Sequence, residues 1–159
     1  MALHKLLVDD FSDDTYVLIA IHCGVEDYRM AYLINRCLGV NLTRTVTDID
    51  LNYTSSSYAL FNWYDRPNDE NWYLVANVCK KEEESLSSSG VLFANDHKVT
   101  KTYNLLPEMP KVDYFLKITN ERCLVNTKWI NSKLQLISQL ITSYEVNLSQ
   151  VKSKEHLIF

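Results

Sequence analysis

Two short groups of residues pair a carboxylate with a tyrosine and are the first candidates for chemistry. One group, Asp27-Tyr28-Arg29, lies at the start of a predicted helix, and the other, Asp113-Tyr114, lies at the start of a predicted strand. A carboxylate beside a phenol or a guanidinium can exchange protons or hold a polar ligand. If the two elements meet, Glu108, Asp113 and Arg29 would line a small polar site. If the two elements do not meet, the tyrosine rings pack against their neighbours. The carboxylates then cap backbone amides or form ion pairs with Arg29. The candidate binding residues are Asp27, Tyr28, Arg29, Glu108, Asp113 and Tyr114.

The familiar catalytic signatures are missing from the sequence. Its only glycines are Gly24, Gly39 and Gly90, which excludes a P-loop and a dinucleotide-binding GxGxxG motif. The four histidines are scattered and form no HExxH motif, so we expect no metal. The four cysteines are widely separated, without a CxxC pair, and should be reduced. We therefore expect no cofactor, and the chain resembles a binding protein more than an enzyme.

Aromatic residues gather in one predicted hairpin. They could stack unpaired bases, as some sheets do when they bind single-stranded nucleic acid. However, the acids Asp65, Asp69 and Glu70 lie in the same hairpin and would repel phosphates. Core packing or a protein interface is therefore the favoured role. The aromatic residues are Tyr58, Phe61, Trp63, Tyr64, Trp72 and Tyr73.

The composition is that of an ordinary globular protein. The 159 residues are 47% hydrophobic and 23% charged, which suits one domain with one hydrophobic core. The formal net charge of −4 offers no general attraction to polyanions. No apolar run approaches the ~20 residues of a membrane span, and the acids Asp9 and Asp10 interrupt any signal-like segment. We therefore expect a cytoplasmic protein that binds neither nucleic acid nor membrane.

Strands must position most of the candidate residues. β-branched and aromatic residues, separated by turn-forming clusters, predict strands over residues 3–8, 15–23, 42–53, 58–64, 71–79, 103–106, 112–118 and 140–146. The strand over residues 15–23 contains a continuous apolar run and should lie centrally in the sheet. It should pair with the strand over residues 3–8 in a hairpin. The charged, Ser-rich residues 80–90 predict a long surface loop. Pro107 and Pro110 predict a rigid, non-helical connector that delivers Val112 to the sheet.

Two amphipathic helices complete the predicted fold. Residues 25–38 carry apolar side chains at helical spacing and are followed by Gly39, a residue that favours helix ends. Ile130, Leu134 and Ile137 predict a second helix, which Asn126 can cap. This helix would join two strands as a β-α-β unit. The predicted fold class is α+β, a single domain with a mainly antiparallel sheet of about seven strands packed by two amphipathic helices.

One segment resembles a known family signature. Residues 106–114 read Leu-Pro-Glu-Met-Pro-Lys-Val-Asp-Tyr and resemble the motif of the IPExxxVDY family, with Leu106 in place of Ile. Further similarity lies in residues 27–29, in Asn35, in Leu38 with Gly39, and in the closing Lys-Ser-Lys-Glu-His-Leu-Ile-Phe of residues 152–159. The resemblance implies a bacterial protein, characteristic of Bacteroidetes. The family has no established activity, so no catalytic residue carries over.

These observations favour a non-enzymatic binding or interaction module. The alternative is a small-molecule sensor or enzyme with a polar site near Glu108, Asp113 and Arg29. Partners would be an unknown protein or a small molecule, and the chain should be a monomer or small homo-oligomer. The sequence leaves open whether the LPExxxVDY segment has a structural or a functional role.

Overall fold

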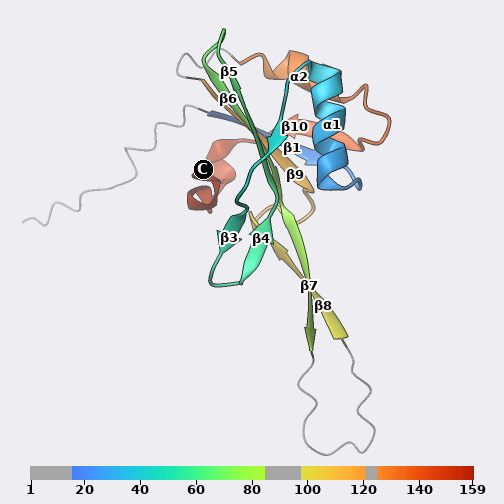
Figure 1. The fold of residues 1–159 in the computed structure, drawn as a ribbon, viewed down its shortest axis with the longest axis vertical. Helices are drawn as coiled ribbons and strands as arrows, with labels where there is room; N and C mark the ends of the chain where they lie inside the picture. Colours follow the sequence, from blue (N-terminus) through green and yellow to red (C-terminus); the bar gives the residue numbers. More distant parts are fainter. Residues whose placement is uncertain (1–15, 85–97, 121–124) are drawn as a thin grey trace, which may run out of the picture.

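The computed structural model describes residues 16–84, 98–120 and 125–159. Within them the chain forms a mixed α+β fold with two α-helices and a mostly antiparallel sheet, as the sequence predicted (Figure 1). The predicted strand at residues 3–8 and its hairpin lie outside the described residues. Among the described residues, neither α-helix is long and apolar enough to cross a membrane.

Six strands form the main sheet. They are β1 Tyr16–His22, β2 Thr43–Arg44, β5 Leu60–Asp65, β6 Glu70–Ala76, β9 Tyr114–Asn120 and β10 Thr142–Glu145. Their order is β10-β1-β9-β6-β5-β2, and every neighbouring pair is antiparallel. β9 lies between β1 and β6, so neither of its edges is free, and packing on both faces of the sheet buries nearly all of its residues.

One face of the sheet packs against two helices, α1 (Asp27–Leu38) and α2 (Thr127–Leu134). Met30 and Ile34 of α1 and Ile130 of α2 join the core on this face, as the apolar spacing predicted. α1 ends at Gly39, whose φ of 71° is left-handed and easily reached without a side chain. α2 begins as expected at Asn126, whose side chain accepts a hydrogen bond from the Trp129 amide.

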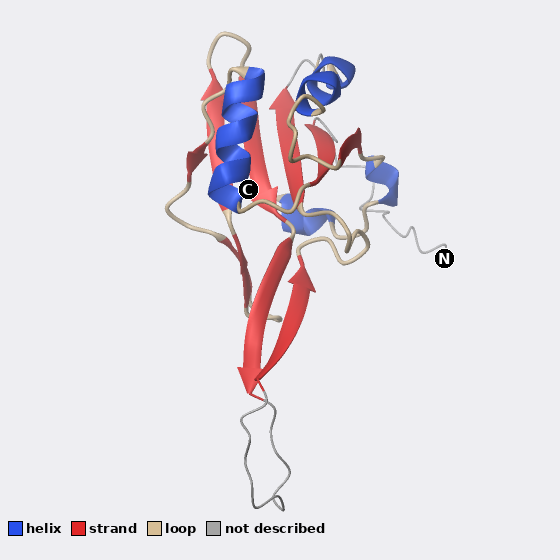
Figure 2. Cartoon of the chain, turned by 90° about the vertical axis from the view of Figure 1, so that its right-hand side faces the viewer, coloured by secondary structure: helices blue, strands red, loops and turns tan. Residues whose placement is uncertain are grey.

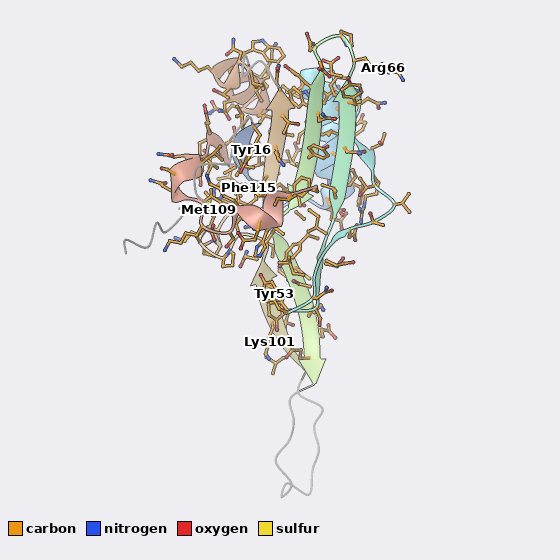
Figure 3. All side chains as sticks on the ribbon, turned by 90° about the vertical axis from the view of Figure 1, so that its left-hand side faces the viewer. Tyr16, Tyr53, Arg66, Lys101, Met109 and Phe115 are labelled. Carbon is orange, nitrogen blue, oxygen red and sulfur yellow. The ribbon has the colours of Figure 1, made fainter. Side chains whose placement is uncertain are left out.

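The opposite face of the sheet is covered mainly by irregular chain. A second apolar cluster there joins strand residues such as Leu18 and Phe115 to residues 105–112 and to the C-terminal segment, residues 146–159. This segment contains two short 3-10 helices, Leu148–Gln150 and Lys154–Leu157. Figure 3 looks onto this side of the molecule, with Tyr16, Phe115 and Met109 labelled around the segment. Both faces of the sheet are therefore packed.

Two small ribbons extend from the main sheet. β3 (Ile49–Leu51) pairs with β4 (Ser56–Tyr58), and β7 (Val78–Glu84) pairs with β8 (Lys98–Asn104). Figure 2 shows the β7–β8 ribbon projecting from the body of the protein. The outer part of β7 reads Lys-Lys-Glu-Glu-Glu and has no apolar face, as suits a ribbon that projects into solvent.

The ribbons explain why the main sheet has six strands and not the predicted seven or so. Predicted strand 42–53 is divided into β2 and β3, with the fully exposed Val46 between them. Strand 58–64 is divided between β4 and β5, and strand 71–79 is divided at Asn77 between β6 and β7. In each case the chain leaves the main sheet and pairs elsewhere, which apolar patterning does not reveal.

The loop prediction for residues 80–90 is wrong in its first part. β7 continues to Glu84, paired with β8, and the rest of that range lies outside the described residues. β8 likewise begins earlier than the predicted strand 103–106 and ends at Asn104. Polar sequence indicated a loop here because a two-stranded ribbon exposed on both faces needs no apolar alternation.

The predicted β-α-β unit is present in a modified form. α2 joins β9 to β10, and both strands are antiparallel to β1. β9 and β10 therefore run in the same direction, with β1 inserted between them.

Candidate functional site

The LPExxxV segment forms two consecutive turns, residues 106–109 and 109–112. The Met109 amide donates to the Leu106 carbonyl at 3.0 Å, and the Val112 amide donates to the Met109 carbonyl at 3.2 Å. Each turn has a proline at its second position, where the fixed φ of proline is favourable. The predicted non-helical connector is confirmed, and it buries Val112 against the sheet.

Asn77 holds this double turn in place from the β6–β7 junction. Its side-chain amide donates to the carbonyls of Met109 at 2.9 Å and Val112 at 2.8 Å, and its oxygen accepts from the Leu106 amide at 2.9 Å. The Asn77 residue is completely buried. Backbone groups that would otherwise be unpaired in the core are thereby satisfied. Sequence analysis did not single out Asn77, because one polar residue between two apolar runs resembles an ordinary strand position.

Glu108 projects from the double turn and binds the C-terminal segment. Its Oε1 accepts hydrogen bonds from the amides of Lys152 at 2.7 Å and Ser153 at 2.9 Å, and its Oε2 accepts from Ser153 Oγ at 3.2 Å. Partial burial raises the pKa of Glu108, but these hydrogen bonds to the charged form outweigh it and leave the pKa below its usual value. The two segments that carry the family resemblance are thus in direct contact.

Further contacts fix the C-terminal segment to the sheet. His156 Nδ1 lies 2.7 Å from the Leu105 carbonyl oxygen. The buried Lys117 Nζ donates to the Leu157 carbonyl at 2.6 Å and lies 4.8 Å from the ring centroids of both Tyr16 and Phe159. Burial lowers the pKa of Lys117. This lysine lies beneath the segment and serves as one of its anchors.

Asp113 and Tyr114 point to a different place, the connection that leads into α1. The Asp113 Oδ2 accepts from the Cys23 amide at 2.8 Å, and the Tyr114 hydroxyl donates to the Val25 carbonyl at 2.5 Å. Burial, with the nearby Asp27 carboxylate, raises the pKa of Tyr114. The strand and helix ends therefore do meet, through Asp113, Tyr114 and the residues just before Asp27.

The remaining candidates lie apart from this contact. Tyr28 and Arg29 are exposed on α1, and the Tyr28 amide donates to the neighbouring Asp27 Oδ1 at 2.7 Å. A cavity of about 280 Å³ lies beside Glu108, but its lining includes neither Asp113 nor Arg29. The structure thus brings Asp27, Asp113 and Tyr114 into one neighbourhood, while Glu108 binds the C-terminal segment.

A second cavity, of about 290 Å³, lies at the opposite end of the sheet from the β7–β8 ribbon, between β5, β6, the end of α1 and the start of α2 (Figure 1). All three tryptophans of the chain line it, so we call it the tryptophan pocket. Figure 3 labels Arg66 in the β5–β6 turn at this end of the sheet. The residues that line the tryptophan pocket are Leu38, Gly39, Val40, Trp63, Asp65, Asn68, Glu70, Trp72, Val125, Asn126, Trp129 and Ile130.

The tryptophans come from three elements and differ in exposure. Trp63 of β5 and Trp72 of β6 are directly opposite in register, with ring centroids 6.2 Å apart at 54°. Trp72 is buried, Trp63 is half-buried and Trp129 in the first turn of α2 is 47% exposed. The pocket therefore has one buried aromatic wall and one wall open to solvent.

Two carboxylates accompany the tryptophans. Glu70 Oε2 accepts from the Trp72 indole at 3.0 Å, and Glu70 Oε1 accepts from Asn120 Nδ2 at 2.9 Å. Asp65 Oδ2 accepts from Asn68 Nδ2 at 2.7 Å. These neutral donors orient both carboxylates and leave their negative charge in place. No lining residue among those the structure describes is basic.

The backbone of the pocket is held by residues that sequence analysis had noted for other reasons. The Asn35 side chain donates to the Leu42 carbonyl at 2.9 Å and accepts from the Leu42 amide at 2.8 Å. These two hydrogen bonds hold in place the segment after α1, which contains Gly39 and Val40. Trp63 and Trp72 were expected in core packing or an interface. Nothing in the sequence pattern linked them to Trp129, which is distant along the chain.

Searches among family models, curated proteins and solved structures find no match to this chain.

Proposed function

We propose that the chain is a non-enzymatic binding module that holds a compact ligand in the tryptophan pocket. The observation that carries this proposal is the convergence of Trp63, Trp72 and Trp129 on one cavity. Tryptophan offers a large rigid surface and a polar N–H, and it is enriched where proteins bind partners. The cavity volume of about 290 Å³ is at the lower end of the range for small-molecule sites.

Core packing alone accounts for Trp72 but not for Trp129. A core tryptophan gains stability by being buried, as Trp72 is. Trp129 lines the cavity and leaves almost half of its surface exposed. A bound ligand would cover that surface, and its apolar contact would supply binding free energy.

The polar site near Glu108, Asp113 and Arg29 is the weaker candidate. Both oxygens of Glu108 already accept hydrogen bonds from the C-terminal segment, and Asp113 accepts one from Cys23. A ligand would have to displace these contacts. We therefore assign Glu108 and Asp113 a structural role.

The test is a fluorescence titration of the intact protein with three compact probes of similar shape. Tetramethylammonium is cationic, tert-butanol is neutral and pivalate is anionic, so the set covers each charge class. We expect at least one probe to change the tryptophan emission saturably. Trp129→Ala should weaken that response about tenfold, because one wall of the pocket is lost.

The matched control is Tyr32→Ala, which removes a similarly exposed aromatic ring from α1, outside the pocket. It should leave the titration unchanged. A protein that responds to none of the probes, or whose response survives Trp129→Ala unchanged, would contradict the proposed function.

We also propose that the chain belongs with the IPExxxVDY family and is cytoplasmic. The proposed family rests on the resemblance of residues 106–114 and 152–159 to its motifs. The proposed cytoplasmic location rests on the sequence, in which no apolar run approaches the ~20 residues of a membrane span.

A further inference from the structure

We infer that the ligand of the tryptophan pocket carries a methylated ammonium group, such as a quaternary amine. This inference rests on the proposed binding function and names the chemical class of its ligand. Three features of the pocket support it: aromatic walls, two carboxylates whose hydrogen-bond partners among the described residues are neutral, and the end of α1.

The aromatic walls are the first feature. The face of an indole ring carries negative electrostatic potential and attracts cations more strongly than other aromatic side chains do. Trp63 and Trp72 are tilted by 54°, so their faces are not stacked on one another. With Trp129 they place three indole rings around one cavity, as in the aromatic cages that hold quaternary ammonium groups. Lys133 Nζ, from a residue that does not line the cavity, lies 5.9 Å from the Trp129 ring centroid.

The carboxylates are the second feature. Asp65 and Glu70 both line the cavity, and the hydrogen-bond partners found for them among the described residues are neutral amides and an indole. A fully substituted ammonium group has no N–H to donate. It is attracted by negative charge and does not need a free hydrogen-bond acceptor. Carboxylates that are already oriented by neutral donors supply that charge.

The end of α1 is the third feature. Leu38 and Gly39 line the cavity, and the last carbonyls of a helix carry partial negative charge. The start of α2 also faces the cavity and has the opposite sign. However, the Asn126 side chain accepts from the Trp129 amide at 3.0 Å and so satisfies one of its free donors. Because the two helix ends carry opposite partial charges, the preference for a cation rests mainly on the carboxylates of Asp65 and Glu70.

Neutral and anionic ligands fit these features less well. An anion would face Asp65 and Glu70 without any basic lining residue in the described part of the chain. A neutral ligand of the same shape would keep the apolar contacts but gain nothing from the carboxylates or the ring faces. The comparison between a cation and its neutral isostere therefore isolates the inference.

The experiment is isothermal titration of the intact protein with choline and with 3,3-dimethylbutan-1-ol, its uncharged isostere. We expect choline to bind at least about tenfold more tightly, the effect of a cation–π interaction at a partly desolvated site. Asp65→Asn should lower the affinity for choline about threefold to tenfold and leave the isostere unaffected. Glu145→Gln removes an exposed carboxylate on β10 and is the matched control.

The outcomes separate this inference from the proposed function. If the isostere binds as tightly as choline, or if Asp65→Asn leaves the ratio of their affinities unchanged, the pocket binds ligands but the cationic inference is overturned. If neither compound binds, and tert-butanol and pivalate also fail, the proposed function fails with it. N-acetyl-trimethyllysine amide, titrated in parallel, distinguishes a free metabolite from a modified protein side chain as the source of the group.

Discussion

Asn77 is the residue on which the local structure depends most. It is completely buried, and its side chain makes three hydrogen bonds to the backbone of the double turn. The Asn77 backbone also pairs with Asp113 and Leu105. One residue therefore joins the end of β6 to the turn that precedes β9.

Replacing Asn77 should reveal this role. Asn77→Ala leaves the buried Leu106 amide and Val112 carbonyl without their side-chain partner, while the Met109 carbonyl keeps the Val112 amide, so we expect a loss of about 3 kcal/mol in the free energy of unfolding. Asn52→Ala, an exposed asparagine in the β3–β4 turn, should stay within about 0.5 kcal/mol. Urea denaturation of both variants is the measurement. Equal effects would show that the hydrogen bonds of Asn77 do not hold the double turn.

Glu108 makes stability depend on pH in a predictable direction. Because its pKa is lowered in the folded protein, its stabilising effect is present above the ordinary pKa of about 4.3 and is lost as the pH falls through the lowered value. The difference in unfolding free energy between the wild type and Glu108→Gln should therefore be largest at neutral pH and shrink in acid. Urea denaturation at pH 7, 5, 4 and 3 measures it.

The control for this series is Glu145→Gln, which alters an exposed carboxylate on β10. A difference that grows in acid for Glu108→Gln would contradict the hydrogen-bonded, charged state of Glu108.

At the scale of elements, the C-terminal segment acts as a cover for one face of the sheet. Val146, Val151 and Leu157 are buried against the same cluster as Leu18 and Phe115. The segment contains only short 3-10 helices, so its own backbone contributes little stability. Burial and the anchors from Glu108, His156 and Lys117 must hold it.

Two adjacent residues in the segment provide a sharp comparison. Leu157 is 1% exposed and Ile158 is 81% exposed. We expect Leu157→Ala to cost about 2–5 kcal/mol, whereas Ile158→Ala should cost about 0.5 kcal/mol or less. Thermal and chemical denaturation would measure both. A larger cost at Ile158 would mean that the segment packs in a different register.

The same scale shows what the sequence could and could not predict. α1 and β1 were predictable because their apolar residues follow one helical face or one continuous run. The division of predicted strands was not, because it depends on which distant segment each stretch pairs with. At Asn77, for example, β6 ends because the next residues pair with β8 and not with the main sheet.

The candidate site was predictable only in part for the same reason. The sequence marked Asp113 and Asp27 as candidates but left open whether their elements meet. The structure shows that they do. Glu108 lies on the same predicted connector, yet it turns towards residues 152–153, a contact that spans more than forty positions. The tryptophan pocket likewise depends on α2 lying beside the end of α1, which only the complete topology determines.

At the scale of the whole molecule, the chain separates its structural contacts from its candidate binding site. The LPExxxVDY segment and the C-terminal segment close one face of the sheet. The tryptophan pocket lies between β5, β6, the end of α1 and the start of α2. The β7–β8 ribbon projects from the opposite end of the sheet (Figures 1 and 2). Changes at the exposed wall of the pocket, such as Trp129→Ala, should therefore alter binding without unfolding the protein.

The most direct test of the central claim is fluorine NMR of the intact protein labelled with 5-fluorotryptophan. The chain has three tryptophans, and all of them line the pocket, so each of the three resonances reports on the pocket. On titration with choline, we predict that all three resonances shift saturably with one common dissociation constant, and that 3,3-dimethylbutan-1-ol produces the same pattern only at a much higher concentration. If the three resonances stay unchanged at high concentrations of both choline and the isostere, the account is contradicted.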